Sequence, residues 1–145
     1  MAGGFEDLEV YKEARLLRRR VWKLTKLLPP EEKYILFPQM RRAALSVTNC
    51  IAEGHGSWSY RHNVSYLRRS RGSVNELLDD MNTCEDEGYF KTGHLDDLRG
   101  QAHTVAKLIN GYIAYLQRKM AEADTKKLGS DTGEPDVEPV NRLTS

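Results

Sequence analysis

Apolar residues recur every three or four positions in four separate segments of this 145-residue chain. This spacing places the apolar side chains of each segment on one face of an α-helix. In the last segment the steps alternate between three and four before one final step of four, a near-heptad seam that favours left-handed packing of neighbouring helices. That seam consists of Leu95, Leu98, Ala102, Val105, Ile109, Tyr112, Leu116 and Met120.

The other three segments are bounded by residues that start or end helices. The first runs from Phe5 to Leu28 and stops at two prolines. The second starts near Glu31 with a kink at Pro38, or starts at Pro38 itself, and Gly54 is expected to cap it in a left-handed conformation. A connection over residues 55–59 supplies Ser59 as N-cap of the third, which ends near Gly88. Their stripes are Leu8, Tyr11, Ala14, Leu17, Val21, Leu24 and Leu28; Met40, Ala43, Ala44, Val47 and Ile51; and Val64, Leu67, Val74, Leu77 or Leu78, Met81 and Cys84.

Four amphipathic helices with short connections predict an all-α fold, an antiparallel up-down-up-down four-helix bundle. No strand-like alternation is present. The bundle domain is expected to cover residues 1–128. Residues 129–145 are acidic and contain Gly and Pro, so a disordered tail is expected there.

Charge is distributed unevenly between these two parts. Residues 1–128 hold 21 basic and 17 acidic residues, a charge of +4, whereas residues 129–145 hold one Arg and four acids, a charge of −3. A charge of +4 is modest for a nucleic-acid-binding protein. Such a function would therefore require local clustering or oligomerisation.

The chain lacks the sequence features of membrane and secreted proteins. No run approaches the roughly 18 apolar residues of a membrane helix, and the N-terminus does not resemble a signal peptide. We therefore expect a cytoplasmic protein with no membrane partner. Cys50 and Cys84 have no CxxC spacing and are expected to be free, mostly buried thiols.

The sequence contains no recognisable motif for catalysis, metal binding or cofactor binding. Neither a phosphate-binding loop nor a GxGxxG motif occurs, and the four histidines lie singly. The acidic run over residues 79–88 has Cys84 at a ligand position of a calcium loop, so a solvated helix end is the better interpretation. We expect a protein that is not an enzyme, with no cofactor and no metal.

Basic residues cluster on the first three segments. Arginines of the third segment lie among Tyr60 and Tyr66, with Trp58 just before them, and this composition is typical of surfaces that contact phosphates and stack on bases. The alternative is an ordinary solvated helix surface with intramolecular ion pairs, for instance from Arg68 or Arg69 to Glu53 or Glu76. The residues expected to contact phosphates of RNA or DNA are Arg15, Arg19, Arg41, Arg42, Arg68 and Arg69.

Short pieces of sequence, in a specific order and spacing, resemble a known family. They include FEDL at residues 5–8, EKY at 32–34, QMRRAA at 39–44, IAEG at 51–54, RGS at 71–73 and GY at 88–89. The chain resembles small bacterial four-helix bundle proteins found as reading frames inside intervening sequences of large-subunit ribosomal RNA genes. It is also similar to the Avd-like accessory variability proteins of diversity-generating retroelements.

The resemblance implies a ring-like homopentamer with a basic surface, and it implies nucleic acid and a reverse transcriptase as partners of the retroelement proteins. Thr48, Cys50 and Pro38 depart from the family pattern. The competing hypothesis is a protein-interaction scaffold or adaptor that binds no nucleic acid.

Four residues are expected to serve structure or oligomerisation. They are Glu53, Gly54, Arg71 and Gly72. Arg71 interrupts the apolar stripe of the third segment, and Glu53 is its expected partner in a buried pair, within the chain or between subunits.

Overall fold

The computed structural model describes residues 3–130, and every regular element in this range is helical. The four long helices are α1 (Glu9–Thr25), α2 (Leu36–Gly56), α3 (Tyr60–Asp86) and α4 (Asp96–Ser130). Short 3₁₀ helices, η1 (Phe5–Asp7) and η2 (Pro30–Glu32), precede α1 and α2. The prediction of an all-α fold with four helices is confirmed.

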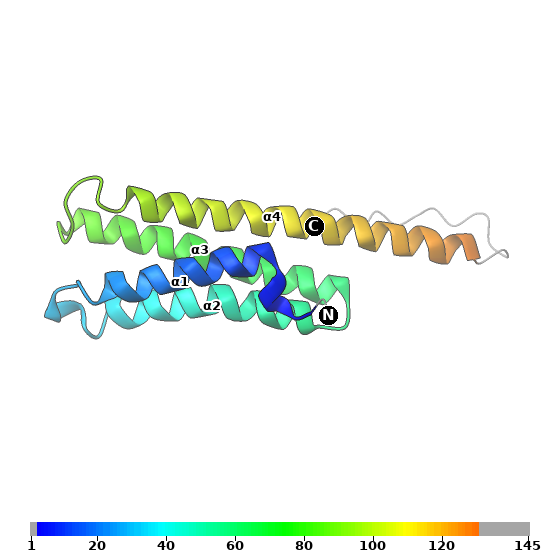
Figure 1. Ribbon diagram of the computed structural model, residues 1–145, viewed down its shortest axis with the longest axis horizontal. Helices are drawn as coiled ribbons and strands as arrows, with labels where there is room; N and C mark the ends of the chain where they lie inside the picture. The colour runs from blue at the N-terminus through cyan, green and yellow to red at the C-terminus, as the bar shows by residue number, and fades with distance from the viewer. Residues whose placement is uncertain (1–2, 131–145) are drawn as a thin grey trace.

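Each long helix packs along two neighbours. α1 packs against α2 and α4, and α3 packs against the same two helices (Figure 1). α4 is the longest of the four, and its C-terminal part extends past the ends of the other three (Figure 1). The shared core receives side chains from all four helices, and its largest fully buried members include Leu17, Met40, Ile51, Leu67, Leu77, Met81, Leu95 and Ile109.

Most of the predicted stripe residues belong to this core, whereas Leu8, Leu28 and Met120 are only partly buried. Two further differences concern α4 and α3. In α4, Ile113 is buried and Tyr112 is only partly buried, so the seam passes one residue later than expected. In α3, Ser70 is fully buried and fills the place next to Arg71 in the stripe. Its hydroxyl donates a 2.8 Å hydrogen bond to the carbonyl of Val47, which satisfies the buried polar group.

α2 begins two residues before Pro38, close to the second of the two predicted starts. Pro38 therefore lies in the first helical turn, where a missing N–H leaves no hydrogen bond unmade. The Glu32 carboxylate accepts a hydrogen bond of 3.4 Å from the backbone N–H of Leu36 at this helix end.

Gly54 does not cap α2, and that prediction is wrong. The helix continues to Gly56, and the glycines with positive φ in the described chain are Gly88 and Gly93. Gly54 is buried against α3, where a Cβ would stand 2.6 Å from Oδ1 of Asn63. The residue therefore permits close approach of two helices rather than a left-handed turn.

The predicted boundaries of α3 are confirmed. The Ser59 hydroxyl accepts a hydrogen bond from the backbone N–H of His62, as an N-cap should. At the other end, Gly88 has φ of 72°, and two backbone bonds of 3.0 Å close the turn, from Gly88 to Glu85 and from Tyr89 to Cys84. This pairing is a Schellman motif, which favours glycine at the left-handed position.

Other expectations concern the thiols, the membrane and the tail. Cys50 and Cys84 are both free and buried, as predicted. Among residues 3–130, no helix combines the length and apolarity needed to cross a bilayer. α4 includes Gly129 and Ser130, whereas the rest of the expected disordered tail, residues 131–145, lies outside the described residues.

Candidate nucleic-acid interface

Charge is segregated along the chain into a basic region and an acidic region. Residues 14–52, which include most of α1 and α2, contain nine Lys or Arg and two acids. Residues 76–97, at the C-terminal end of α3 and the start of α4, contain eight Asp or Glu and one Lys. The basic residues of α1 and α2 thus lie on adjacent helices. Arg20 is directed to α4 instead, where it forms a 2.9 Å ion pair with Asp97.

A groove, here called the basic groove, lies between α1 and α2. It encloses about 560 Å³ and is lined by Arg18, Arg19, Trp22, Lys23 and Leu45. Arg18 donates a 2.9 Å hydrogen bond to the hydroxyl of Thr48, which ties one cationic wall to α2. The groove thus combines cationic groups with apolar surface from Trp22 and Leu45.

Arg41 lies beside this groove, but its guanidinium is held inside the protomer. Its central carbon lies 4.5 Å from the ring centroid of Trp22 and 4.1 Å from that of Phe37. Its Nε donates to the Thr25 hydroxyl at 2.9 Å, and Nη2 donates to the Trp22 carbonyl at 3.3 Å. Stacking and hydrogen bonding together make Arg41 a link between α1 and α2.

The structure separates the six predicted phosphate-contacting arginines into three groups. Arg15, Arg19 and Arg42 are exposed on α1 and α2, and Arg19 lines the basic groove. Arg41 is partly buried in the contacts above. Arg68 and Arg69 lie on α3 and do not line the groove, and the Arg69 guanidinium lies 5.5 Å from the Tyr66 ring centroid.

Sequence reasoning assigned only Arg19 of the five groove residues to the site. Arg18 and Lys23 belong to the basic cluster of the first segment, and neither Trp22 nor Leu45 was singled out. A signal for both existed in the pattern. Trp22 follows Arg18 and Arg19 at helical spacing, and Leu45 is an apolar residue outside the buried stripe of α2, 40% exposed.

The expected pair of Glu53 and Arg71 does not form within the chain. Arg71 donates a 2.7 Å hydrogen bond to Oδ1 of Asn110 on α4, and Glu53 is exposed near the end of α2. The prediction of a buried pair inside the protomer is therefore wrong. Gly72, also predicted to be structural, is exposed, and a Cβ there would meet nothing within 4 Å.

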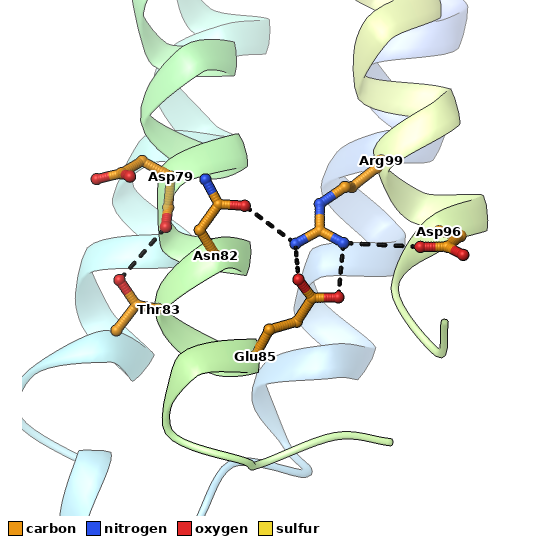
Figure 2. Close-up of polar contacts among 6 residues, drawn as sticks. All are labelled: Asp79, Asn82, Thr83, Glu85, Asp96 and Arg99. Carbon is orange, nitrogen blue, oxygen red and sulfur yellow. Dashed lines mark hydrogen bonds and ion pairs between the residues drawn. The ribbon is translucent and has the colours of Figure 1, made fainter. Parts of the chain in front are cut away.

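The acidic region contains a polar cluster that sequence reasoning missed, centred on Arg99 (Figure 2). Arg99 of α4 forms a two-point ion pair with Glu85 of α3, with N···O distances of 2.6 and 2.8 Å. It also donates to Asn82 at 3.1 Å, and Asp96 lies 3.7 Å away. The hydrogen bonds from Arg99 lower the pKa of Glu85, and those to Glu85 raise the pKa of Arg99. Part of the acidic run therefore fastens α3 to α4.

One carboxylate of the same run is buried. Asp80 is 3% exposed, and its Oδ1 accepts a 2.7 Å hydrogen bond from Nε2 of Gln39, while Oδ2 has no hydrogen-bond partner among residues 3–130. Burial raises its pKa from 3.8 to about 6, with Glu76 and Asp79 adding to the rise and Gln39 opposing it. Within residues 3–130, no three His, Cys, Asp or Glu side chains are grouped to hold a metal ion.

Four packed helices with a cationic groove on one side define a small helical bundle protein. The chain belongs to the 23S rRNA-intervening sequence protein family, whose model matches residues 6–111. A similar fold occurs in a crystal structure of a protein of unknown function from the S23 ribosomal protein family of Bacteroides thetaiotaomicron. The TM-score is 0.67 at 17% sequence identity, over 72% of this chain and 97% of that one. A search of curated proteins finds no match.

Proposed function

We propose that this protein is a non-enzymatic, oligomeric protein that binds RNA or DNA through the phosphates, using the basic groove and the exposed cations beside it. One observation carries the proposal. From Ala14 to Thr25, α1 has no carboxylate, and α2 has a single one, Glu53 near its end. The exposed cations on this side are Arg15, Arg19, Lys23, Lys26 and Arg42.

Exposed cations on adjacent helices attract a polyanion, and counterion release then supplies much of the binding free energy. The contacts are made to phosphates, so we expect no base specificity from the groove. The acidic end of α3 and α4 repels nucleic acid. The segregation of charge therefore restricts binding to one side of the protomer.

The proposed protomer is an antiparallel up-down-up-down bundle, and five copies form a ring. Contacts between α2 and α3 support an antiparallel arrangement of these two helices. Ser73, later in α3, bonds to Ser46, earlier in α2, whereas Asn63 near the start of α3 lies against Gly54 near the end of α2. The ring is the expectation from family resemblance. A core of +4 repeated five times gives a charge of about +20, enough to concentrate nucleic acid near the surface.

The family description, which refers to 23S rRNA, supports a cytoplasmic location and RNA as a partner. A narrower form of the proposal is an accessory role beside a reverse transcriptase in a diversity-generating retroelement. The resemblance to Avd-like proteins supports that form. A reverse-transcriptase gene next to this one would distinguish it from a general RNA-binding role.

A salt series tests phosphate binding directly. Fluorescence anisotropy would measure the affinity of a labelled structured RNA and of a duplex DNA, with oligomer mass recorded on the same sample. Replacing Arg19, Lys23 and Arg42 by Gln should weaken binding of both ligands and reduce the salt slope by about one for each lost phosphate contact. A matched control replaces three exposed lysines on other parts of the chain, Lys91, Lys107 and Lys126, by Gln. Equal effects of the two triple variants would contradict the assignment of the groove.

A scaffold or adaptor that binds a protein is the second candidate. Exposed apolar side chains at the α1–α2 connection favour it, since Tyr34 is 83% and Ile35 is 63% exposed. Absence of nucleic-acid binding at low salt by an intact oligomer would support this candidate over the first.

A further inference from the structure

A second hollow lies where the α2–α3 connection meets α4, at the end of the bundle that α4 extends beyond (Figure 1). It encloses about 620 Å³. We call it the aromatic hollow, because Trp58, Tyr60, Tyr112 and Tyr115 are among its nine lining residues. None of these four residues lines the basic groove.

Trp58 is the most unusual residue of this hollow. It is 92% exposed, although tryptophan is buried in most folded proteins and its burial is strongly favourable. Its ring is stacked on His62 with a centroid distance of 6.1 Å and an angle of 18°. His62 is in turn held by Ser59, whose Oγ lies 2.6 Å from Nδ1 of His62. An exposed indole held beside a fixed ring is ready to stack on a further flat group.

α4 supplies the opposite wall. The Tyr112 hydroxyl accepts a 3.2 Å hydrogen bond from Nδ2 of Asn63, which fixes one ring of the wall to α3. The ring centroids of Tyr112 and Tyr115 are 6.4 Å apart, and Tyr115 is 46% exposed. Arg118 and Lys119 lie 6.0 and 5.6 Å from the Tyr115 ring centroid. Aromatic faces thus lie next to cationic groups.

The chemistry of this lining selects among occupants. No carboxylate occurs among the lining residues, all of which belong to the described chain, and their polar side-chain groups are hydroxyls, an amide, an imidazole and an indole N–H. Aromatic faces bind bases by stacking, and nearby cations bind the phosphates of the same strand. A base inside a duplex cannot reach such a surface, because both of its faces are already stacked.

We propose that the aromatic hollow binds an unpaired nucleobase of a single strand, which stacks on Trp58 and Tyr115 while Arg118 and Lys119 contact the adjacent phosphates. This inference rests on the proposed function and adds a preference that the basic groove does not supply. The groove binds phosphates of single and double strands alike. The hollow adds affinity only for strands with unpaired bases.

The first test compares a short oligouridylate with an RNA duplex of equal length by fluorescence anisotropy. Trp58→Ala and Tyr115→Ala should each weaken oligouridylate binding about 5- to 150-fold, the range for loss of one stacked base. Duplex binding should stay within about twofold, since phosphate contacts are unchanged. Tyr34→Ala is the matched control, because it removes an exposed aromatic ring from the α1–α2 connection.

A second measurement tests whether the base stacks on Trp58 itself. The chain has two tryptophans, so Trp22→Phe leaves Trp58 as the only indole. Oligouridylate should quench its fluorescence, and the duplex should not. Quenching in this variant also shows binding without an alanine substitution in the α2–α3 connection.

The outcomes separate this inference from the proposed function. If oligouridylate and duplex both bind but Trp58→Ala and Tyr115→Ala change neither, and Trp58 is not quenched, stacking in the hollow is refuted while phosphate binding stands. If wild-type protein binds neither ligand at low salt, both proposals fail. If Trp58→Ala weakens both ligands equally or lowers the oligomer mass, the hollow is a contact between protein chains and the inference is overturned.

Discussion

Gly54 of α2 and Asn63 of α3 lie so close together that a Cβ on the glycine would stand 2.6 Å from Oδ1 of the asparagine. The same Cβ would lie 3.0 Å from Cβ of Tyr66. Small residues at helix contacts let backbones approach, and Asn63 uses this proximity to hold Tyr112 of α4. The glycine thus helps to position three helices at the end of the bundle that carries the aromatic hollow.

Gly54→Ala should lower the free energy of unfolding by about 1 to 3 kcal/mol, the usual cost of overpacking a close contact. Alanine's better helix propensity offsets only part of this cost. Urea unfolding followed by circular dichroism would measure the change. Gly100→Ala in α4 is the control, because a Cβ there meets nothing within 4 Å and the exposed substitution should stabilise the helix by about 1 kcal/mol. Equal effects of both substitutions would show that the contact has no influence.

The fold was largely predictable because hydrophobic periodicity records which helix face is buried, whatever the neighbouring helix is. The stripes through Leu17, Val47, Leu67 and Ile109 all became core. Gly54 was misassigned because glycine serves two purposes, a left-handed cap or a close approach, and the sequence near a helix end does not distinguish them. The close contact of Gly54 is made with Asn63, which belongs to another helix, so the sequence near Gly54 does not reveal it.

Arg41 and Arg42 should respond differently to the same conservative change. Arg41→Lys removes the planar group between Trp22 and Phe37 and the Nε bond to Thr25, so we expect a loss of about 1 to 2 kcal/mol of stability. Arg42 is exposed, and Arg42→Lys should change stability by less than about 0.5 kcal/mol. Thermal unfolding of both variants checks this. A larger loss for Arg42→Lys would contradict the structural role given to Arg41.

The candidate site was less predictable than the fold for a related reason. Adjacent arginines look alike in a sequence, yet successive helical positions differ by about 100° around the axis. Arg41 consequently turns toward Trp22 of α1, while Arg42 is exposed. The basic groove combines residues of two helices, and its depth depends on packing that a one-dimensional pattern does not contain.

The ion pair of Glu85 and Arg99 should make stability depend on both pH and salt. The pKa of Glu85 is lowered in the folded state by Arg99, so its contribution is present above the unfolded pKa and is lost as the pH falls. Glu85→Gln should lower the unfolding temperature at neutral pH and low salt. High salt should reduce the difference from wild type. Exposed Glu87→Gln is the control, and a salt-independent difference for Glu85→Gln would argue against an electrostatic contribution.

Asp80 should give stability the opposite pH dependence to that of Glu85, because burial raises the pKa of its carboxyl to about 6 from 3.8. The folded state then holds the proton more tightly than the unfolded state, so stability is highest below the unfolded pKa and falls as the pH rises through this interval. The difference between the folded and the unfolded pKa corresponds to a loss of roughly 2 to 3 kcal/mol of stability at neutral pH. Asp80→Asn keeps an acceptor for Gln39 without the buried charge, and it should raise the unfolding free energy at neutral pH by roughly 1 to 3 kcal/mol.

Urea unfolding at a series of pH values would compare Asp80→Asn with wild type and with Asp79→Asn, the exposed neighbour. The gain from Asp80→Asn should shrink as the pH falls toward the unfolded pKa, because the wild-type carboxyl becomes neutral as well. Asp79→Asn should show little change at any pH. A gain that is the same at low and neutral pH would mean that packing, rather than the buried charge on Asp80, sets the cost at this contact between α2 and α3.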